Sequence, residues 1–539
     1  MKTGFSFCMM VFACCTITGQ NAELLKDINP GTGSSFISYM TQLGDKVIFQ
    51  AIVPGADSGP WVTDGTADGT FLLKKMTGQS GKMTVFKNLV YFSGDDGIHG
   101  QELWQTDGTI EGTIMVKDIF PGSYGSKPAE LTVFNDVLFF SGNHPDYGEE
   151  LYVLHVTDNE TVIGIYDITE GPESTKPGWL YPAYGKLYFV GRENRYLYYH
   201  DPTKGITGIY NDGVKPGPTG NPYFAEYNCS VYFPAIEADI FEAKLGVQLW
   251  KVLTDGYVVR LTEIFSDNVD LKPRHLTRVG DKLFFSGSTA SFGDELCVYT
   301  GEVYAPGITY MVKNINPSGD GNLGGFITAF KDRLIFSAGD ATTGVELWVS
   351  DGTESGTKLI RDIYPGPVSS GIVSPVIIGD TLYFSADDGT GSELWRLINP
   401  DGQPEKFTNI PDGGAWGPEL VRIGKTFIFS ASNKATGTEL WKMSVSGATA
   451  AEKLISETED IIVYPNPVTD HISIQCTDQF SNRASISFYN SEGVKIMTKT
   501  IGNTLAPFCI KNLNWSPGLY FLRIEDGSKQ AVKKFIVTE

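Results

Sequence analysis

The chain of 539 residues repeats one short pattern along most of its length, and this repetition constrains the fold more than any other feature. Residues 101–109 read QELWQTDGT, and residues 345–353 read VELWVSDGT. Weaker copies of the Glu-Leu-Trp pattern are centred on Trp61, Tyr152, Tyr198, Trp250, Cys297, Trp395 and Trp441. From Trp61 to Trp441 the nine copies cover 380 residues in eight intervals, so the period is about 47 residues.

Each unit holds the same order of strand and turn signals. An apolar strand (as in 131–136) is followed by a second strand (138–141), a Gly-rich loop, the Glu-Leu-Trp strand, an Asp-Gly turn and a last strand that ends at Pro-Gly (115–122). Asp-Gly between apolar runs is typical of a hairpin. Four short antiparallel strands in a unit of this length are typical of a propeller blade. We therefore predict an all-β fold: a β-propeller of about eight or nine four-stranded blades, followed by a small β-sandwich.

The segment that precedes the first complete unit, residues 24–31, reads LLKDINPG and matches the last strand of a unit. Such a displaced strand can pair with the final blade, which closes the ring and leaves few free strand edges. We predict this closure. A split into two smaller propellers and an open array are the alternatives that the pattern leaves open.

The charge and composition argue against several classes of function. The net charge is −21, which argues against binding to nucleic acid or to anionic lipid, because both attract basic surfaces. A hydrophobic content of 41% is that of a globular protein. Two of the seven Cys residues, Cys476 and Cys509, lie near the C-terminus; they either form a disulfide or remain thiols, and no CxxC spacing predicts zinc.

The N-terminus has the features of a secretory signal peptide. Lys2 supplies the positive charge, and residues 5–17 form an apolar run that is too short to span a bilayer. Cleavage is expected near Gly19 or Ala22, which assigns residues 1–21 to the signal. No other run of 18 or more apolar residues occurs, so we predict no membrane span.

The repeated Glu-Leu-Trp and Asp-Gly-Thr sequences resemble the bacterial ELWxxDGT repeat family. The resemblance covers residues 22–456 and is most complete in residues 101–109 and 345–353. It is partial elsewhere, since the first unit lacks the Glu-Leu pair and the middle units lack the full Asp-Gly-Thr. The resemblance implies a secreted, propeller-like repeat protein and brings no defined activity with it.

The last part of the chain, residues 459–539, has a different character. Alternating apolar and polar residues at 471–475, 486–490, 519–524 and 532–537 predict half-buried strands. The length of this part and the spacing of its strands are typical of a small β-sandwich.

This stretch resembles the type A sorting domain of the type IX secretion system. The residues that carry the resemblance are Tyr464, Pro465, Asn466, Pro467, Gly493, Gly518, Leu519, Tyr520 and the closing run Lys534–Val537. The resemblance implies passage through the periplasm and export across the outer membrane by the type IX machinery, which leaves the protein extracellular or attached to the cell surface. It also implies that the domain is cleaved from its cargo, and that the source is a bacterium of the Bacteroidetes type.

No catalytic motif is visible in the sequence. The chain has no HExxH, no GxSxG elbow, no Walker loop and no dinucleotide fingerprint, and its six His residues are isolated. The repeated Leu is expected in the core between blades, and the repeated Glu is expected to accept hydrogen bonds from the adjacent Gly-rich loop. The repeated Trp is expected to pack nearby, with one face exposed for sugar stacking as the alternative. We predict no catalytic and no cofactor-binding residue.

Two of the Gly-rich loops carry paired carboxylates, Asp95 with Asp96 and Asp387 with Asp388. The Ser-x-Asp-x-Gly of these loops is similar to the start of a sialidase Asp-box, but the Trp comes too late. Clustered carboxylate oxygens are the ligands that calcium prefers. The four Asp residues are therefore weak candidates for a calcium site, and no other metal or cofactor is expected.

These features favour a non-enzymatic binding or adhesion module outside the cell, which holds a glycan or a protein ligand on one rim of the propeller. Two alternatives remain: a propeller hydrolase or lyase that acts on extracellular polysaccharide, and a purely structural surface protein. Residues 192–200 and 237–246 depart from the repeat, so they are either a specific binding surface or the result of sequence drift.

Overall fold

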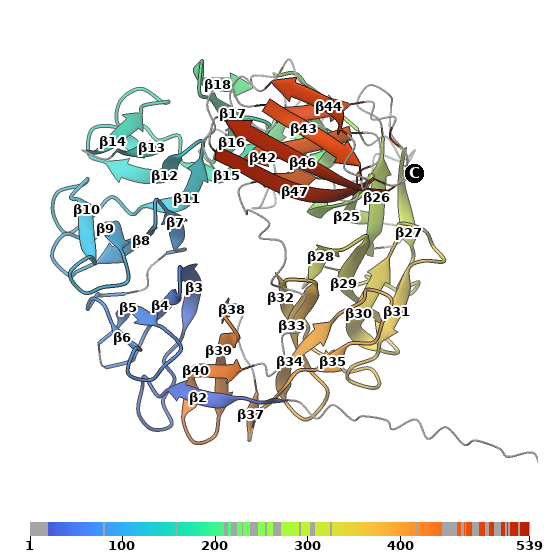
Figure 1. The fold of residues 1–539 in the computed structure, drawn as a ribbon, viewed down its shortest axis with the longest axis horizontal. Helices are drawn as coiled ribbons and strands as arrows, with labels where there is room; N and C mark the ends of the chain where they lie inside the picture. Colours follow the sequence, from blue (N-terminus) through green and yellow to red (C-terminus); the bar gives the residue numbers. More distant parts are fainter. Residues whose placement is uncertain are drawn as a thin grey trace, which may run out of the picture.

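The computed structural model describes residues 20–537 apart from gaps at 56, 79–80, 158–159, 194, 210–213, 217–223, 229, 238–245, 254–255, 262–270, 290–292, 302–307, 324–325, 411, 415–418, 445–460, 465–467, 469–470, 477–484, 491–494, 501–507, 512–514, 516–517 and 527–528. Strands β1 to β47 make up the regular structure of the described residues, which confirms the predicted all-β fold (Figure 1). No helix in this part of the chain is long and apolar enough to cross a membrane. Residues 1–19 of the predicted signal peptide lie outside the described residues.

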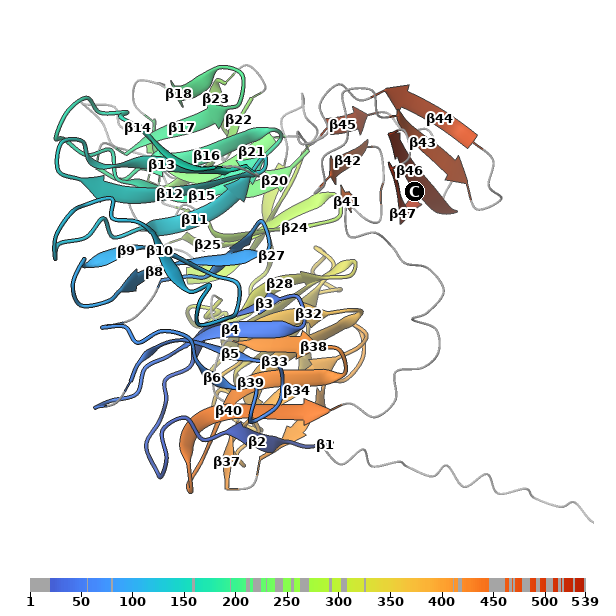
Figure 2. The same ribbon diagram turned by 60° about the vertical axis from the view of Figure 1, so that its left-hand side comes forward.

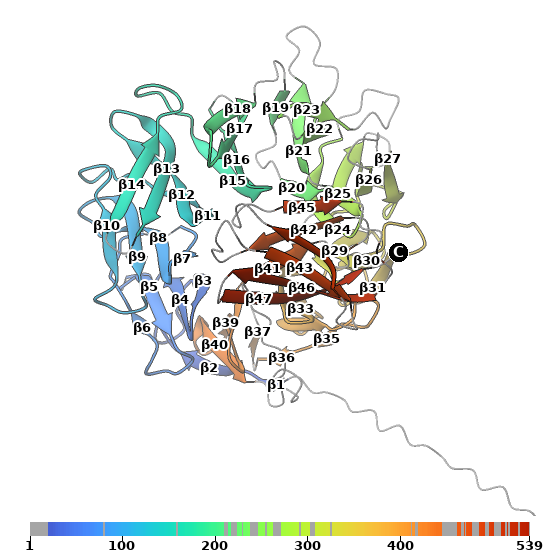
Figure 3. The same cartoon turned by 45° about the horizontal axis from the view of Figure 1, so that its top comes forward.

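Antiparallel sheets follow one another around a ring, as the blades of a propeller do (Figures 1 and 3). The described residues contain nine such sheets, which we number blades 1 to 9 along the chain. Blades 1 to 3 comprise β3 (Ser38–Leu43), β4 (Lys46–Ala51), β5 (Gly59–Thr63), β6 (Phe71–Leu72); β7 (Thr84–Phe86), β8 (Leu89–Asp95), β9 (Gln101–Thr106), β10 (Ile114–Lys117); and β11 (Ala129–Phe134), β12 (Val137–His144), β13 (Gly148–Val156), β14 (Thr161–Tyr166).

The remaining blades repeat this order of strands, with the first strand innermost (Figure 1). Blades 4 to 6 comprise β15 (Pro177–Ala183), β16 (Lys186–Gly191), β17 (Tyr196–Asp201), β18 (Gly205–Ile209); β19 (Val214–Pro216), β20 (Ala225–Tyr227), β21 (Ser230–Glu237), β22 (Gln248–Val252), β23 (Val258–Arg260); and β24 (Arg274–Val279), β25 (Lys282–Thr289), β26 (Gly293–Thr300), β27 (Ile308–Lys313). Blades 7 and 8 comprise β28 (Ile327–Phe330), β29 (Arg333–Asp340), β30 (Gly344–Ser350), β31 (Lys358–Arg361); and β32 (Val373–Ile378), β33 (Thr381–Asp387), β34 (Ser392–Leu397), β35 (Glu405–Lys406). Blade 9 comprises β2 (Glu23–Lys26), β37 (Gly413–Gly414), β38 (Leu420–Ile423), β39 (Thr426–Asn433) and β40 (Gly437–Ser444).

The repeated Leu and the repeated aromatic residue build the interfaces between blades. Leu347 of blade 7 lies in one apolar cluster with Trp395 of blade 8, and Leu103 of blade 2 lies in one with Tyr152 of blade 3. The same pairing joins Leu151 with Tyr198, Leu197 with Trp250, Leu249 with Cys297, Leu296 with Trp348, and Leu394 with Trp441. The repeated Leu residues are 0–6% exposed, which confirms their predicted place in the core between blades.

The first strands of the described chain complete the last blade. β2 pairs with β40, and Leu24 lies opposite Trp441. The backbone N–H of Ile28 then donates to the carboxylate of Glu439 at 2.7 Å. The predicted closure of the ring by residues 24–31 is therefore confirmed. Ahead of this seam, β1 (Gln20–Asn21) pairs in parallel with β36 (Thr408–Asn409), which follows blade 8.

Glutamates also join neighbouring blades near the ring centre. Five inner strands bulge near their start at a non-glycine residue with φ of 56–63°, namely Tyr39, Glu130, Trp179, His275 and Ser374. A bulge leaves backbone groups outside the ladder. Glu130 of blade 3 accepts the N–H of Trp179 in blade 4 at 3.0 Å, and Glu419 of blade 9 accepts those of Tyr39 and Met40 in blade 1. The bulged backbone of one blade is thus held by a carboxylate of the blade before it.

The Asp-Gly-Thr turn belongs to a longer motif with a closed set of hydrogen bonds. In residues 106–113, Asp107 Oδ1 accepts the N–H and the hydroxyl of Thr109 at 2.9 and 2.7 Å, and Thr106 Oγ1 lies 2.7 Å from Thr113 Oγ1. The hydrogen bond from the Thr109 side chain lowers the pKa of Asp107. The same bonds recur in residues 63–70 and 350–357. The motif is therefore [ST]DGTxxGT, and it fixes the turn that leads into the outermost strand.

The second glycine of this motif has no room for a side chain. A Cβ built on Gly112 would lie 2.1 Å from Asp107 Oδ1, and those on Gly69 and Gly356 would meet Asp64 and Asp351 at 2.1 and 2.0 Å. We expect Gly112→Ala to displace the carboxylate and to destabilise the protein by about 1–3 kcal/mol. Scanning calorimetry should show a lower Tm. Gly319→Ala is the control, since its nearest atom would be 3.6 Å away; equal Tm values for both variants would contradict the steric role.

The C-terminal region forms two facing sheets, as predicted (Figure 2). One holds β41 (Ile461–Tyr464), β42 (His471–Cys476) and β45 (Phe508–Lys511), and the other holds β43 (Ser485–Asn490), β44 (Lys495–Thr500), β46 (Gly518–Asp526) and β47 (Lys529–Val537). A separate apolar core lies between them, built from residues of both sheets such as Ile472, Ile474, Phe488, Leu522 and Phe535.

The strand register bears on the disulfide that the sequence left open between Cys476 and Cys509. Cys509 in β45 lies opposite Ser473 in β42, three positions along the strand from Cys476. Three strand residues span about 10 Å, whereas the two Cα atoms of a disulfide are about 4.4–6.8 Å apart. The register therefore does not bring the two Cα atoms within that range.

Candidate functional site

The antiparallel order of each blade creates two distinct faces of the ring. The loops between the second and third strands lie at the same ends as the segments that link one blade to the next, and we call this the loop face. The turns between the first and second and between the third and fourth strands lie at the opposite ends, and we call this the turn face. The DGT turns therefore belong to the turn face (Figures 2 and 3).

The repeated glutamate clamps the segment that links its own blade to the next. Glu102 is fully buried, and its carboxylate accepts the N–H groups of Ile119, Phe120 and Ser126 at 3.2, 3.0 and 2.8 Å. The Ser126 hydroxyl donates a fourth bond at 2.5 Å. A buried carboxylate is tolerated when its lone pairs are occupied in this way. The clamp fixes both ends of a loop whose middle, residues 121–125, is left free of it.

The same clamp recurs in other blades. Glu346 accepts Ile363 N, Tyr364 N, Ser370 N and Ser370 Oγ at 2.8, 3.4, 3.0 and 2.7 Å. Reduced sets hold Glu150 with Ile168 and Thr175, Glu295 with Ile315 and Asn316, Glu393 with Ile410 and Thr408, and Glu439 with Ile28. The clamped segments at 118–126 and 362–370 share the pattern Asp-Ile-x-Pro-Gly-x-x-x-Ser, which residues 27–35 repeat.

The structure corrects one part of the sequence prediction for this glutamate. It accepts hydrogen bonds, as expected, but from the Pro-Gly segment that follows the outermost strand and not from the Gly-rich loop before it. The Gly-rich loop contributes through Gly100, whose φ is +70° and whose Cβ would lie 2.6 Å from Gly125 N. Glycines two residues before Glu150, Glu295, Glu346 and Glu439 have φ of 66–67°. A Gly-x-Glu pattern thus marks where the clamped loop approaches the backbone.

The end of each clamped loop also binds the next blade. The Ser126 carbonyl accepts Asn143 N of blade 3 at 2.7 Å, and the Ser370 carbonyl accepts Asp387 N of blade 8 at 2.8 Å. The Ser35 carbonyl accepts Ile52 N of blade 1 at 2.9 Å. One residue therefore connects the carboxylate of its own blade with the second strand of the next.

The free middles of the clamped loops differ from blade to blade and reach the solvent. They read PGSYG at 121–125, PGPVS at 365–369, PGTGS at 30–34 and EGPES at 170–174. Tyr124 is 56% exposed. Its ring centroid lies 4.9 Å from that of Phe120 and 3.7 Å from the Lys127 ammonium. Val368, at the equivalent position, is 50% exposed. The frame of each loop is constant while the surface it presents varies.

Burial shifts the titration of the clamping carboxylates. It raises the pKa of Glu102, Glu295, Glu346 and Glu393 above the ordinary value, and it raises those of Glu150 and Glu439 to about 7. The protonation of these groups therefore contributes to the pH dependence of the stability of the ring.

Five of the six repeated tryptophans, all but the half-buried Trp61, offer little free ring surface, which argues against the sugar-stacking alternative for them. Trp104, Trp250, Trp348, Trp395 and Trp441 are all buried. A cation of the preceding blade also lies near the ring: Lys74 by Trp104, Lys313 by Trp348 and Arg361 by Trp395, at 5.6, 5.9 and 5.2 Å from the centroid. These side chains close the interfaces between blades.

The paired aspartates of the Gly-rich loops bind their own loops. Asp95 Oδ1 accepts Gly97 N at 2.7 Å, and Asp96 contacts His99 Nδ1 at 2.8 Å. Asp387 Oδ1 accepts Gly389 N at 2.8 Å, and Asp388 pairs with the Lys406 ammonium at 2.6 Å. Among the described residues, no group of three or more His, Cys, Asp or Glu side chains is placed to hold a metal ion.

The departures from the repeat at 192–200 lie partly in the core. His200 is buried, and its Nε2 lies 3.1 Å from the Tyr166 hydroxyl of the preceding blade. Burial lowers the pKa of His200. Arg192 and Glu193 sit on the loop face, where Arg192 pairs with Glu149 of β13 and Glu193 pairs with Lys176 of the link from blade 3. The insert at 238–245 lies outside the described residues.

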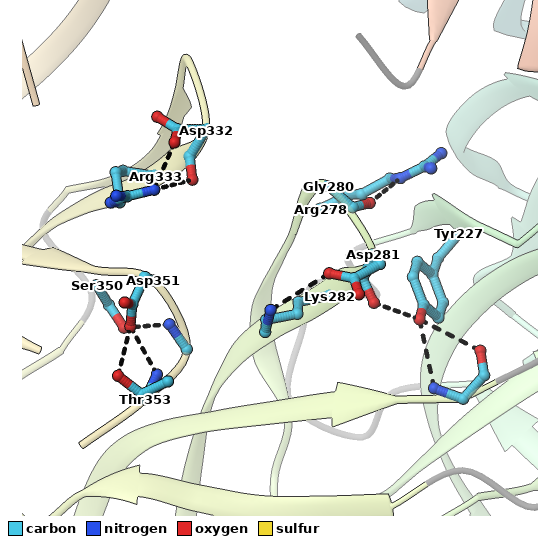
Figure 4. Close-up of polar contacts among 12 residues, drawn as sticks. Tyr227, Arg278, Gly280, Asp281, Lys282, Asp332, Arg333, Ser350, Asp351 and Thr353 are labelled. Carbon is cyan, nitrogen blue, oxygen red and sulfur yellow. Dashed lines mark hydrogen bonds and ion pairs between the residues drawn. The ribbon is translucent and has the colours of Figure 1, made fainter. Parts of the chain in front are cut away.

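The turn face is occupied by contacts that join blades. Tyr227 of blade 5 donates its hydroxyl to the Asp281 carbonyl of blade 6 at 2.6 Å (Figure 4). The turn of blade 7 that contains Asp351 packs against Lys282 of blade 6. A Cβ added to Gly352 in this turn would lie 2.5 Å from the Cδ atom of Lys282. Lys313 Nζ of blade 6 donates to the Thr357 carbonyl at 2.8 Å. These contacts on the turn face join neighbouring blades of the ring.

The residues predicted for the sorting motif lie in and around the sandwich. Tyr464 ends β41, and Gly518, Leu519 and Tyr520 begin β46. Tyr520 is buried and stacks on Trp515 at 5.2 Å, and it lies 5.9 Å from Phe535. Pro465, Asn466, Pro467 and Gly493 lie outside the described residues. Trp515, which is half-buried and packs against the core, was missed by the sequence analysis, although it lies two residues before the Pro-Gly-Leu-Tyr run.

The raised pKa values predict how stability depends on pH. A folded chain with Glu150 and Glu439 near pKa 7 binds more protons than the unfolded chain between pH about 4.5 and 7. The stability that these groups contribute is present below the unfolded pKa and is lost as the pH rises through 7. We expect the Tm of the wild type to fall more steeply between pH 5 and 8 than that of the double variant Glu150→Gln, Glu439→Gln, in scanning calorimetry.

Comparing the slope of Tm against pH in the wild type and in the double variant isolates the contribution of Glu150 and Glu439. Buried His200 and half-buried His275 have lowered pKa values and act with the opposite sign, but they are the same in both proteins. Glu160→Gln, an exposed carboxylate in the same blade as Glu150, is the control and should leave the wild-type slope unchanged. A double variant with the wild-type slope would show that these two carboxylates do not titrate in this range.

Comparison with protein families identifies the C-terminal domain. Residues 462–538 match the model of the secretion system C-terminal sorting domain. The domain directs the chain to export by the type IX secretion system, and so to the cell surface or the extracellular space. The chain therefore interacts with that secretion machinery. A search of curated proteins finds no match.

Solved structures that align with the chain share little sequence with it. A virginiamycin B lyase from Staphylococcus aureus aligns over 59% of this chain and 95% of its own, at 15% identity and a TM-score of 0.33. The β-propeller domain of the Trilobed protease from Pyrococcus furiosus aligns over 71% and 100%, at 11% identity and 0.34. A puromycin hydrolase aligns over 74% of this chain but only 58% of its own, at 14% identity and 0.35. Likeness at this level says nothing about what this chain binds or transforms.

Proposed function

We propose that this chain is an extracellular binding or adhesion module whose propeller holds a glycan or a protein ligand on the loop face. The clamp of the repeated glutamate carries the proposal, because it fixes both ends of loops whose middles differ between blades. Loops of variable sequence on a rigid frame are where proteins most often place ligand contacts. Export by the type IX system gives such a module access to ligands outside the cell.

The proposal includes the assignment of residues 22–456 to the ELWxxDGT repeat family, with a signal peptide at 1–21 and the sorting domain at 459–539. The longer patterns Gly-x-Glu-Leu-Trp, [ST]DGTxxGT and Asp-Ile-x-Pro-Gly-x-x-x-Ser support one repeated unit, since each is used in the same way in several blades. The last propeller strand ends at Ser444 and the first sandwich strand begins at Ile461, which supports a boundary between them. Ala22 is buried and supports a mature chain that retains it.

The first test is a binding screen of the mature chain. We would present it to arrays of neutral polysaccharides, acidic polysaccharides and extracellular proteins, and measure both retention and product release. We expect retention without product release. Release of shortened products would replace the proposal with an enzyme, and the absence of retention on all three arrays would leave a structural role.

A second test asks which face binds. Tyr124→Cys and Val368→Cys place a thiol on the loop face of blades 2 and 7, and Ile110→Cys and Glu354→Cys place one on the turn face of the same blades. Tyr124 and Ile110 are matched, being 56% and 55% exposed. After coupling to a bulky maleimide polymer, the loop-face variants should lose retention and the turn-face variants should keep it. The wild type, treated with the same reagent, controls for the native cysteines; loss only in the turn-face variants would contradict the proposal.

A further inference from the structure

The loop face has a hollow at the junction of blades 8 and 9. It has a volume of about 330 Å³ and is open to solvent. Its walls come from three segments: Gly391 and Ser392 at the start of β34, Asp412–Gly414 in the link between the blades, and Ser432–Lys434 at the end of β39. The volume is at the lower end of the roughly 300–1,000 Å³ that ligand pockets occupy.

The hollow lies where the link between blades departs from the repeated pattern. Pro411 directly follows Ile410, whereas one residue separates the Ile from the Pro in the links that contain Ile28, Ile119, Ile315 and Ile363. Glu393 holds the entry to this link through Ile410 N and the Thr408 hydroxyl, at 2.8 and 2.5 Å. The link then pairs through Gly413 and Gly414 with the end of β39 and forms an extra short strand, β37. The departure therefore changes the shape of the loop face at one junction.

Both positions of this strand require glycine, because backbone atoms of neighbouring segments occupy the space that a side chain would need. A Cβ on Gly413 would lie 1.8 Å from the Ser432 carbonyl oxygen, and one on Gly414 would lie 2.3 Å from that of Ser392. The walls of the hollow are consequently made of peptide groups and small side chains. Drift alone would not be expected to place two such glycines side by side at a point where each is sterically necessary.

The lining offers hydrogen-bonding groups of both kinds. Asp412 is exposed and presents a carboxylate, and Lys434 is exposed and presents an ammonium. The two are neighbours, since Lys434 N donates to the Asp412 carbonyl at 3.3 Å. The Oδ1 atom of Asn433 accepts Ala435 N and Thr436 N within its own loop, which leaves its amide group as a donor. Ser392 and Ser432 add hydroxyls that both donate and accept.

The charges of the hollow select the kind of ligand. Asp412 and Lys434 cancel, so the lining has no net charge, whereas the whole chain carries −21. Such a chain repels polyanions at long range. Alternating donors and acceptors without net charge suit adjacent hydroxyl groups, each of which donates one hydrogen bond and accepts others. A neutral saccharide fits these conditions, and an acidic one does not.

We propose that the hollow at the junction of blades 8 and 9 binds a sugar unit of a neutral glycan, with Asp412 and Lys434 as its specificity-determining residues. The inference rests on the proposed function and names the ligand class and the place on the loop face. Because the hollow is open, the sugar unit can belong to a longer chain that continues over the surface.

Isothermal titration of the mature chain with soluble oligosaccharides tests the proposal. The probes are hexaoses of the cello, xylo, manno and malto series, and an alginate hexamer as the acidic probe. We expect binding of at least one neutral hexaose and not of the alginate hexamer. The double variant Asp412→Asn, Lys434→Gln should raise the Kd about tenfold, because it replaces two charge-assisted hydrogen bonds with neutral ones. Asn tolerates the left-handed backbone of position 412, whose φ is 55°.

Asp380→Asn and Lys425→Gln are matched controls, since both residues are exposed on the turn face of blades 8 and 9, away from the hollow. They should keep the wild-type Kd, and all variants should keep the wild-type Tm. A double variant that binds like the wild type would overturn the hollow as the site and leave the proposed function standing. Binding of alginate or of a protein alone would overturn the neutral glycan, and the absence of any ligand in this titration and in the array screen would overturn both proposals.

Discussion

The buried carboxylate of the repeated glutamate is the interaction on which the ring depends. A charged group without partners in a protein interior is strongly unfavourable, so each of these carboxylates needs donors nearby. The donors come from the segment that leads into the next blade, and the last residue of that segment also binds the next blade through its carbonyl. A fixed set of hydrogen bonds therefore sets the position of each blade relative to the one before it. The middle of the connecting loop takes no part in these bonds.

Each repeated residue of the unit can be assigned to a particular contact within or between blades. The Leu packs toward the following blade and the Trp toward the preceding one, where a Lys or Arg covers its ring. The [ST]DGTxxGT turn closes on itself and meets a lysine of the blade before it. Because these roles use up the repeated residues, specificity has to come from positions that differ between units. This is why we place the proposed ligand contacts on the loop middles and the altered link at 408–414, and not on the repeated Trp residues.

Much of the architecture could be predicted because it follows from periodicity. The number of copies, the order of strands in each and the unpaired strand-like segment at 24–31 lead to a closed propeller, and the alternation near the C-terminus leads to a sandwich. The partner of the glutamate could not be read from local sequence, because Ser126 lies 24 positions after Glu102. A signal for it existed in the matching spacing of Glu346 and Ser370. The hollow at blades 8 and 9 had no such signal, because it is formed by a single departure from the repeat and by three segments that only the fold brings together.

The seam between β2 and β40 distinguishes one junction of the ring from the others. Elsewhere a blade is tied to its neighbour by the chain itself, whereas here four residues of a strand, two glutamates and an apolar cluster hold segments that are about 400 positions apart. A contact between such distant parts of the chain forms late in folding, because a long loop must close first. It is also the place where the ring can open without breaking a covalent bond. Under mechanical load or transient local unfolding, the molecule would part at this seam and become an open arc of blades before any single blade came apart.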